Sequence, residues 1–224
     1  MKKVAIVGAQ ELTRNNAPFE DESFEIWSIS DWILSDWLKR CDVLIEIHQS
    51  GQYMNHPRTP RYWNTLLETD IPVYMYPVPD PRLKKARPYP LDGVLGMVST
   101  GSNQGKAFKP LNSSIAYAMA LAIYQGYEQI DVYGVELAAE SEYAQQRHIF
   151  AFWAGVAAAK GIKLNVNCSD GLLSQPLYGF EDTAEREKIS AMMKEVRRQK
   201  DDAEQVKLMA EGALQFAQAL LEEK

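Results

Sequence analysis

Residues 112–166 constrain the fold most strongly, because they alternate between helical and extended patterns. The apolar run IAYAMALAIYQGY follows the helix-capping residues NSS, and Gly126 offers a good C-terminal stop. Apolar runs at 130–135 and 162–166 predict strands, with a second helix predicted at 142–160. Alternating helices and strands form parallel sheets with right-handed crossovers, so we expect an α/β, Rossmann-like open parallel sheet flanked by helices.

The first half of the chain fits the same sheet. Apolar runs predict four further strands, at Lys3–Val7, Phe24–Ile29, Asp42–Ile47 and Pro72–Tyr76. Helices are expected at 32–39 and 60–68, and a polar loop at 11–21. Prolines crowd residues 77–90, which predicts a surface excursion that could act as a lid. A short strand at 94–98 and a polar loop at 99–110 follow.

Composition narrows the class of protein. A formal net charge of −6 without a basic block argues against broad binding to nucleic acid or anionic membranes. Cys41 and Cys168 lie in no CxxC pair, which is typical of two buried thiols in a reducing compartment. No apolar run is long enough to span a membrane. We therefore expect a cytoplasmic protein that interacts with neither nucleic acid nor membrane.

The chain changes character from Glu181 onward, where Glu, Lys, Gln and Ala dominate. A mostly apolar seam there follows alternating steps of four and three, with one polar interruption at Gln199; its other members are Met192, Val196, Ala203, Val206, Ala210, Ala213, Ala217 and Leu220. This heptad pattern predicts a long helix that packs either on its own domain or, as a coiled coil, on another subunit. We expect a nucleotide-binding domain at 1–178 and a helical segment at 179–224 that makes the protein a homo-oligomer.

In an open parallel sheet, ligands bind at the carboxyl ends of the strands, near the switch in strand order. Small and polar residues collect at or near these predicted ends. The candidate ligand-binding residues are therefore Gly8, Ala9, Gln10, Ser30, Asp31, Ser99, Gly101, Ser113, Ser114, Tyr143 and Arg147. The candidate catalytic residues are His148, His48 and Glu136. The histidines lack the H-x-E and HExxH spacings of zinc sites, so no metal-ligand set is predicted.

Anion binding is the chemistry that several of these residues favour. The helix that follows Asn112 presents free N–H groups and a dipole that attract phosphate, with one serine capping and the other binding; plain capping is the alternative. Arg147 could pair with Glu136 or hold a phosphate with two hydrogen bonds. Both GxGxxG and GxxxxGK[ST] are absent, which argues against a standard dinucleotide fold and against a P-loop NTPase.

Four motifs carry a resemblance to known families: SISDW, HQS, NSSIAYAMALAIYQGYEQIDVYGVEL and GIKLNVNCSDGLL. In this order, over residues 3–173, the chain resembles the bacterial sialyltransferases that use CMP-sialic acid. It equally resembles the pterin diphosphokinase-like family that shares their Rossmann-like core. The segments EYAQQR and LYGFE are also similar to uncharacterised phage-encoded proteins.

The sialyltransferase resemblance implies roles for individual residues. It places Gly8 in a nucleotide-binding turn, Ser30-Asp31 at a ligand-binding position and Ser113 in contact with the donor. His48-Gln49-Ser50 then match an Asn-Pro-Ser motif.

The same resemblance assigns Tyr143 to the departing phosphate. A second phosphate-binding tyrosine of that family falls on Ala138. The family's general-base histidine falls near His148, about one helical turn closer to the next strand than in the family.

Three functions remain open from the sequence. The first is a transferase, glycosyl- or diphosphotransferase-like, that uses a nucleotide-activated donor, with His148 or His48 as the base. Glu136 would orient a sugar hydroxyl or hold a metal, which makes magnesium a candidate cofactor. The second is a non-catalytic protein that binds a nucleotide or nucleotide-derived signal, which Ala138 and the shortened spacing from His148 to the next strand favour. The third is a structural protein whose helical tail matters most.

Overall fold

The computed structural model describes residues 1–55, 60–76, 78–98, 102–103, 106–107, 109–137, 144–168, 173 and 183–222. By their internal contacts, the residues separate into two compact units, Met1–Leu173 and Ser174–Lys224. The boundary expected after residue 178 falls outside the described residues.

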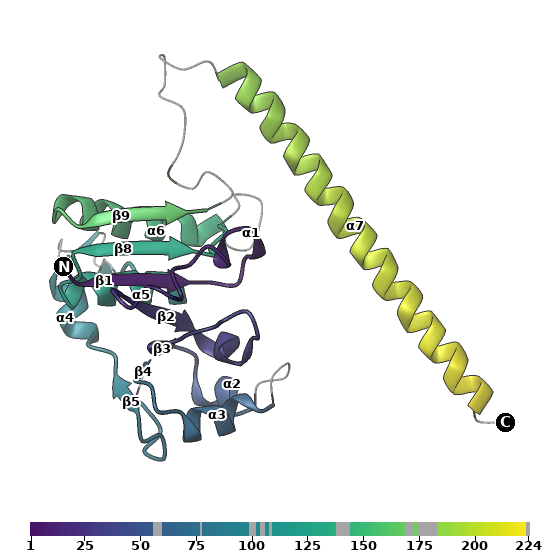
Figure 1. The fold of residues 1–224 in the computed structure, drawn as a ribbon, viewed down its shortest axis with the longest axis horizontal. Coiled ribbons are helices and arrows are strands. Elements are labelled where there is room, and N and C mark those ends of the chain that lie inside the picture. Colours follow the sequence, from purple (N-terminus) through teal and green to yellow (C-terminus); the bar gives the residue numbers. More distant parts are fainter. Residues whose placement is uncertain are drawn as a thin grey trace. The chain divides into compact units, whose positions relative to one another are not determined.

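The first unit is built on a seven-stranded parallel sheet, which confirms the predicted α/β, Rossmann-like fold (Figure 1). Its strands are β1 (Lys3–Val7), β2 (Phe24–Ile29), β3 (Val43–Glu46), β4 (Val73–Met75), β5 (Ala86–Pro88), β8 (Gln129–Tyr133) and β9 (Lys163–Asn167). Two short strands, β6 (Ser102–Asn103) and β7 (Lys106–Ala107), form a separate antiparallel pair.

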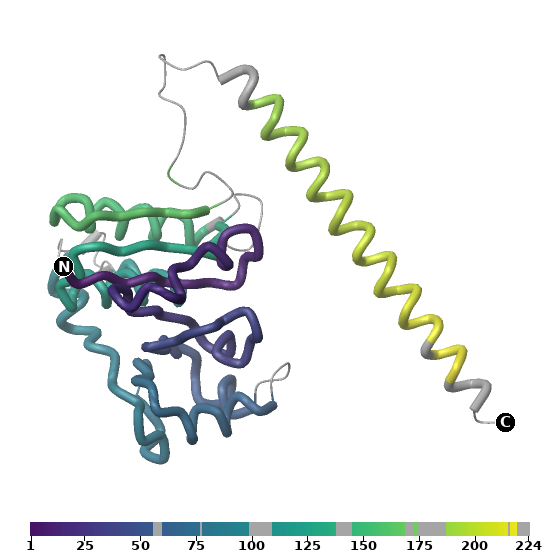
Figure 2. Tube along the Cα trace, in the orientation of Figure 1, coloured from purple at the N-terminus to yellow at the C-terminus, as the bar shows by residue number. Residues whose placement is uncertain are grey.

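The strand order β5-β4-β3-β2-β1-β8-β9 places the switch in chain direction at β1. The chain moves outward from β1 to β5 and then returns to add β8 and β9 on the other side of β1. Figure 2 shows the result, with the purple first strand lying beside the teal β8 and the green β9 lying beyond β8. Ligands of such sheets bind at the carboxyl ends of the strands, so this edge is where a site is expected.

Helices cover both faces of the sheet. They are α1 (Glu11–Arg14), the 3₁₀ turn η1 (Ser30–Leu34), α2 (Ser50–Met54), α3 (Tyr62–Glu68), α4 (Leu91–Gly96), α5 (Ser114–Tyr124) and α6 (Ala144–Ala159). The alternation of side chains along β3 shows the two faces, since Val43 and Ile45 join the core under α5 and α6. Leu44 points the other way, into the core that α2 and α3 complete.

The predicted caps of α5 are confirmed. The Ser113 Oγ accepts a hydrogen bond from the Ala116 N–H at 3.3 Å, and Gly126 ends the helix with a φ of +74°. The helix is buried on most sides, because it contacts β1, β2 and β3 as well as α4 and α6. Its N-terminus therefore lies at the carboxyl edge of the sheet, as in any strand-to-strand crossover.

Three local predictions were wrong. Residues 94–98 do not form a strand, because Leu91, Val94 and Val98 follow helical spacing and α4 packs against α5. The helix expected at 32–39 is only the turn η1, which ends where Ser35 becomes extended. The polar loop at 11–21 begins with α1, which the Gln10 side chain caps by accepting from the Thr13 N–H.

The described part of the proline-rich segment meets the sheet at its edge, through β5, as expected for residues that cannot donate along a central strand. Cys41 and Cys168 are both partly buried, and burial raises the pKa of the Cys41 thiol to about 12. No described helix is both long and apolar enough to cross a membrane.

The second unit contains α7 (Thr183–Glu222), a continuous helix of 40 residues. The predicted long C-terminal helix is thus confirmed.

Candidate active site

A buried carboxylate organises the carboxyl end of β3. Glu46 is fully buried, at 0% exposure, because the alternation of β3 turns its side chain toward α3. Its Oε2 accepts hydrogen bonds from the Tyr62 hydroxyl at 2.6 Å and from the Ser30 hydroxyl at 3.0 Å. Its Oε1 accepts from the His48 backbone N–H at 2.8 Å. The carboxylate therefore has charge-assisted partners that offset its loss of water.

His48 forms a dyad with this carboxylate. The imidazole Nδ1 lies 2.7 Å from Glu46 Oε1, so Nδ1 carries the proton and donates it. The hydrogen bond to Glu46 raises the pKa of His48 above its ordinary value, against the smaller effect of burial. Burial alone would raise the pKa of Glu46, but the hydrogen bonds from His48 and Tyr62 outweigh it and lower that pKa.

The dyad engages Nδ1 and leaves Nε2, the other ring nitrogen of His48, outside it. The His48 side chain is 42% exposed, and Nδ1 is engaged with Glu46. A neutral imidazole in this tautomer has its lone pair on Nε2, which can accept a proton from a ligand. Glu46 then stabilises the imidazolium that forms, as a carboxylate does in a Ser-His-Asp triad.

Ser30 supports the dyad from a strained backbone. Its φ is +50°, in the left-handed region, and it is the one non-glycine residue with positive φ in the described part of the chain. Such a conformation costs roughly 1–2 kcal/mol for a residue with a side chain. Glycine would avoid that cost but would lose the hydroxyl that donates to Glu46.

A pocket of about 220 Å³ opens beside the dyad. It is lined by His48, Gln49, Ser50, Tyr53, Met75, Tyr76 and Val78. These residues come from the ends of β3 and β4 and from α2, so the pocket lies at the carboxyl edge of the sheet. The lining combines aromatic surface with a few polar groups, as is common in small-molecule sites.

An aromatic chain connects this pocket to the N-terminus of α5. The ring of Tyr76, in the pocket wall, lies 6.2 Å from the ring of Tyr117 on α5. Tyr117 is one helical turn after Ser113 and donates its backbone N–H to the Ser113 carbonyl at 3.1 Å. His48 and Ser113, two candidates far apart in sequence, thus both lie at the carboxyl edge of the sheet, and the Tyr76–Tyr117 contact joins the pocket wall to α5.

The carboxyl ends of β1 and β8 are organised differently, by backbone contacts. The Gly8 N–H donates to the Tyr133 carbonyl at 2.8 Å, and the Gln10 N–H donates to the Gly134 carbonyl at 2.9 Å. A Cβ on Gly8 would overlap the Gly134 carbonyl oxygen, so packing alone requires glycine there. Ala9 accepts a hydrogen bond from the Arg14 guanidinium at 2.6 Å. Ligand binding by Gly8, Ala9 and Gln10 stays a prediction.

The remaining candidates lie around the start of α6. Arg147 donates to the Leu137 carbonyl at 3.0 Å, next to the partly buried Glu136, and His148 is exposed on α6. The Asn112 side chain donates to the Gln145 carbonyl at 3.0 Å, which ties this region to the start of α5. Ser99, Gly101 and Tyr143 lie outside the described residues.

The structure therefore divides the candidates into two groups. Ser30, Asp31 and His48 belong to the β2–β3 end, whereas Glu136, Arg147 and His148 belong to the β8 end. Strand β8 is three strands from β3, or about 14 Å at the usual strand spacing. Among the described residues, no three His, Cys, Asp or Glu side chains are grouped to hold a metal ion.

Sequence reasoning missed Glu46 and Tyr62. The signal was present in the strand VLIEIH, where one acid interrupts a run that is buried on both faces. A charge in such a run needs partners, and the nearest titratable residue on the chain is His48. Tyr62 could not be found this way, because only the packing of α3 on β3 brings it to the carboxylate.

Comparisons with known proteins identify the fold. No protein-family model matches the chain, and no curated protein matches it. Among solved structures, a variant of the sialyltransferase Cst-II in complex with CMP has a TM-score of 0.51 at 15% identity, covering 78% of this chain and 84% of that one. The sialyltransferase CstII from Campylobacter jejuni with CMP-3FNeuAc gives 0.49 at 15% identity, covering 78% and 83%.

The monofunctional α-2,3-sialyltransferase Cst-I, also from Campylobacter jejuni, gives a TM-score of 0.47 at 11% identity, covering 88% of this chain and 95% of that one. At these identities the likeness concerns the fold alone, so the first of the three shows that the chain has a sialyltransferase-like α/β fold. These neighbours support neither the pterin diphosphokinase-like nor the phage part of the expected resemblance.

Proposed function

We propose that the chain is a glycosyltransferase-like enzyme that uses a nucleotide-activated sugar, with His48 as the general base. The observation that carries the proposal is the Glu46–His48 dyad, in which a fully buried carboxylate holds an imidazole at the mouth of a pocket. A neighbour with the same fold is a sialyltransferase in complex with CMP, which supports a nucleotide-activated donor.

In the proposed reaction, Nε2 of His48 takes the proton of an acceptor hydroxyl. The acceptor oxygen forms a bond to the anomeric carbon of the donor, and the bond from that carbon to the nucleotide phosphate oxygen breaks. The leaving phosphate keeps the electron pair, and the proton stays on His48. Because Glu46 favours the imidazolium, the dyad lowers the energy of this charged state.

The leaving phosphate needs positive partners. The N-terminus of α5, at Ser113 and Ser114, supplies backbone N–H groups and the positive end of a helix dipole. Its connection to the pocket through Tyr117 and Tyr76 supports placing the phosphate between these residues and the dyad. Tyr143 and Arg147, expected to hold the phosphate, stay in the proposal as residues to be tested. Magnesium likewise stays a candidate cofactor.

The test compares His48→Ala with His148→Ala in the full chain. CMP-, UDP- and GDP-sugars are first screened by thermal shift, with and without magnesium, and nucleotide release is then measured with each donor that binds. We expect His48→Ala to lower kcat by about 10²–10⁴-fold while donor binding is kept, since a general base typically contributes that much. His148→Ala should leave kcat within about threefold, as expected for an exposed residue away from the dyad.

Two outcomes would overturn the proposal. Donor binding without turnover in the unaltered chain would make the protein a non-catalytic nucleotide binder. Loss of turnover in His148→Ala but not in His48→Ala would move the base to α6.

A further inference from the structure

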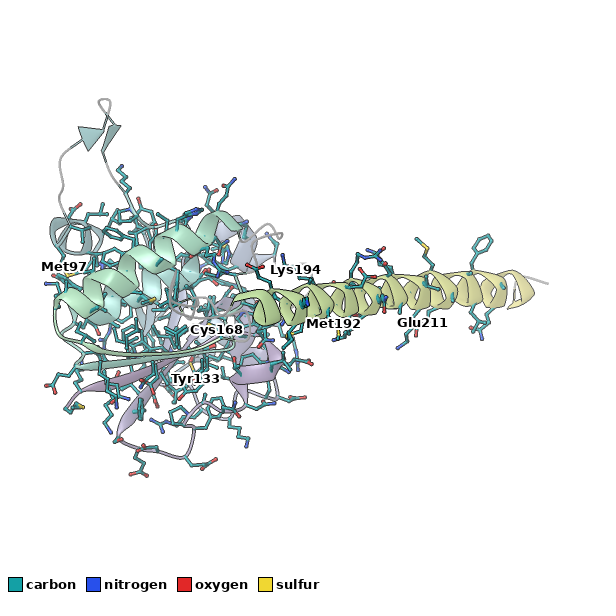
Figure 3. All side chains as sticks on the ribbon, turned by 90° about the horizontal axis from the view of Figure 1, so that it is seen from above. Met97, Tyr133, Cys168, Met192, Lys194 and Glu211 are labelled. Carbon is teal, nitrogen blue, oxygen red and sulfur yellow. The ribbon has the colours of Figure 1, made fainter. Side chains whose placement is uncertain are left out.

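The helix α7 presents an apolar stripe along much of its length. With Ile189 at position a, the first and fourth positions of successive heptads are Ile189, Met192, Val196, Gln199, Ala203, Val206, Ala210, Ala213 and Ala217. The large side chains among them, Ile189, Met192, Val196 and Val206, are all more than half exposed. Figure 3 shows side chains standing out along α7, with Met192, Lys194 and Glu211 labelled.

A stripe of this kind needs a partner. Forty helical residues extend about 60 Å, and most of the stability of a helix in a protein comes from packing of its apolar face. The ion pairs within α7, such as Arg198 with Glu195 at 2.7 Å, are exposed and contribute little.

We propose that α7 pairs with α7 of a second copy of this chain, as a parallel, in-register coiled-coil dimer. The charges beside the stripe carry this orientation. In a parallel pair, each g position faces the e position five residues later on the other helix. Glu195 then faces Lys200, and Asp202 faces Lys207. Further along, Met209 faces Leu214, so that apolar residues meet.

An antiparallel pair would bring like charges together. There, e positions face e positions and g positions face g positions. Between residues 193 and 214 the charged e residues are both lysines, Lys200 and Lys207, and the charged g residues are both acids, Glu195 and Asp202. No antiparallel register of this segment pairs opposite charges at these positions. The fourth parallel pair, Lys188 with Met193, is neutral and favours neither orientation.

The register is also specified. Gln199 is the one polar residue in the stripe between Ile189 and Ala217. Only in the in-register parallel pair does its amide meet the same amide of the partner helix, where both can hydrogen-bond. Ile189 and Val196 are β-branched residues at a positions, where parallel dimers commonly carry such residues.

The first experiment measures mass and dissociation constant of the full chain by sedimentation equilibrium, for the unaltered protein, Val206→Glu and Leu208→Glu. Both residues are large, apolar and similarly exposed, at 66% and 61%, but only Val206 lies in the stripe. We expect the unaltered chain to have the mass of two copies. Val206→Glu should weaken association by about 100-fold or more, because it buries a charge, and Leu208→Glu should change it by less than about threefold.

The second experiment tests orientation by exchanging charges. Glu195→Lys and Lys200→Glu each create like-charged pairs on both sides of a parallel dimer, so each should weaken association by about fivefold to tenfold at low salt. The double variant restores opposite charges and should recover the original dissociation constant within about twofold.

Three results would overturn the proposal. The unaltered chain could remain a single copy at all concentrations, as expected if α7 is covered within its own chain. Val206→Glu and Leu208→Glu could have equal effects, which would place the contact elsewhere. The double charge exchange could fail to restore association, which would exclude the parallel register. None of these measurements depends on a nucleotide, so they stand apart from the proposed function.

Discussion

Two parts of the sheet's carboxyl edge, at β1 and β8 and at β3, satisfy their polar groups in different ways. At β1 and β8, the polar groups are mostly backbone, and Gly8 and Gly134 close against each other through hydrogen bonds to the neighbouring chain segment. At β3, the polar groups are side chains, and Glu46, Ser30, Tyr62 and His48 satisfy one another around a buried charge. The first arrangement is explained by packing alone.

The second arrangement is not explained by packing alone. A buried carboxylate is weak evidence for stability, since a well-packed apolar side chain would often stabilise as well. Ser30 adds a strained backbone to the same cluster. Strain and buried charge in one place, beside a pocket, are features that active sites commonly combine. We therefore expect a structural role for the β1–β8 end and propose the chemistry for the β3 end.

The largest expected effect tests the structural end. Gly134→Ala places a side chain on a residue with φ of +62°, where its Cβ would overlap the Gly8 carbonyl oxygen. Strain and overpacking together should destabilise the first unit by about 2–5 kcal/mol. Urea unfolding followed by tryptophan fluorescence measures this, because all five tryptophans lie within Met1–Leu173.

Gly126→Ala is the matched control. Gly126 also has a positive φ, of +74°, but an added Cβ would meet open space. It should therefore cost only the strain, about 1–2 kcal/mol. Equal losses in the two variants would show that the close approach of β1 and β8 contributes nothing beyond backbone conformation.

The next largest effect tests whether the negative charge of Glu46, at the end of β3, raises the pKa of His48. Glu46→Gln keeps a hydrogen-bonding side chain of the same shape but removes its negative charge, so the pKa of His48 should fall toward or below its ordinary value. NMR titration of the His48 imidazole measures it directly. An unchanged pKa would mean that the dyad does not operate as the geometry indicates.

The same shifts fix a pH dependence of stability. The pKa of His48 is raised from 6.5, so its contribution is full below that value and is lost as pH rises through the raised pKa. The pKa of Glu46 is lowered from 4.5, so its contribution is present above that value and is lost as pH falls through the lowered pKa. The dyad therefore stabilises most between pH 4.5 and pH 6.5, and Glu46→Gln should lower stability within this window and reduce the losses of stability on either side of it.

Much of the fold was predictable, because periodicity and capping are local signals. The first two strands and the capped helix after Ser113 lie where the sequence places them. The site was less predictable, because His48 becomes a dyad only through Glu46, whose partners Ser30 and Tyr62 are each 16 residues away. Gly8 is the opposite case, because its position after a strand predicts ligand binding. The structure shows that close packing against Gly134, which is distant in sequence, already requires a glycine there.

The smallest expected effect separates two properties of Ser30, its strained backbone and the hydrogen bond from its hydroxyl to Glu46. Ser30→Ala keeps the left-handed strain and removes the hydroxyl, leaving Glu46 with one fewer donor, at a cost of about 1–3 kcal/mol. Ser30→Gly removes the same hydroxyl but also relieves the strain, so it should be about 1 kcal/mol more stable than Ser30→Ala. Urea unfolding of both variants measures this difference. If both variants also lower kcat with the same nucleotide-activated sugar while the binding of that sugar is unchanged, the Ser30 hydroxyl positions the dyad. If alanine and glycine are equally stable, the backbone at Ser30 is not strained, and the contrast between the two ends rests on the buried charge alone.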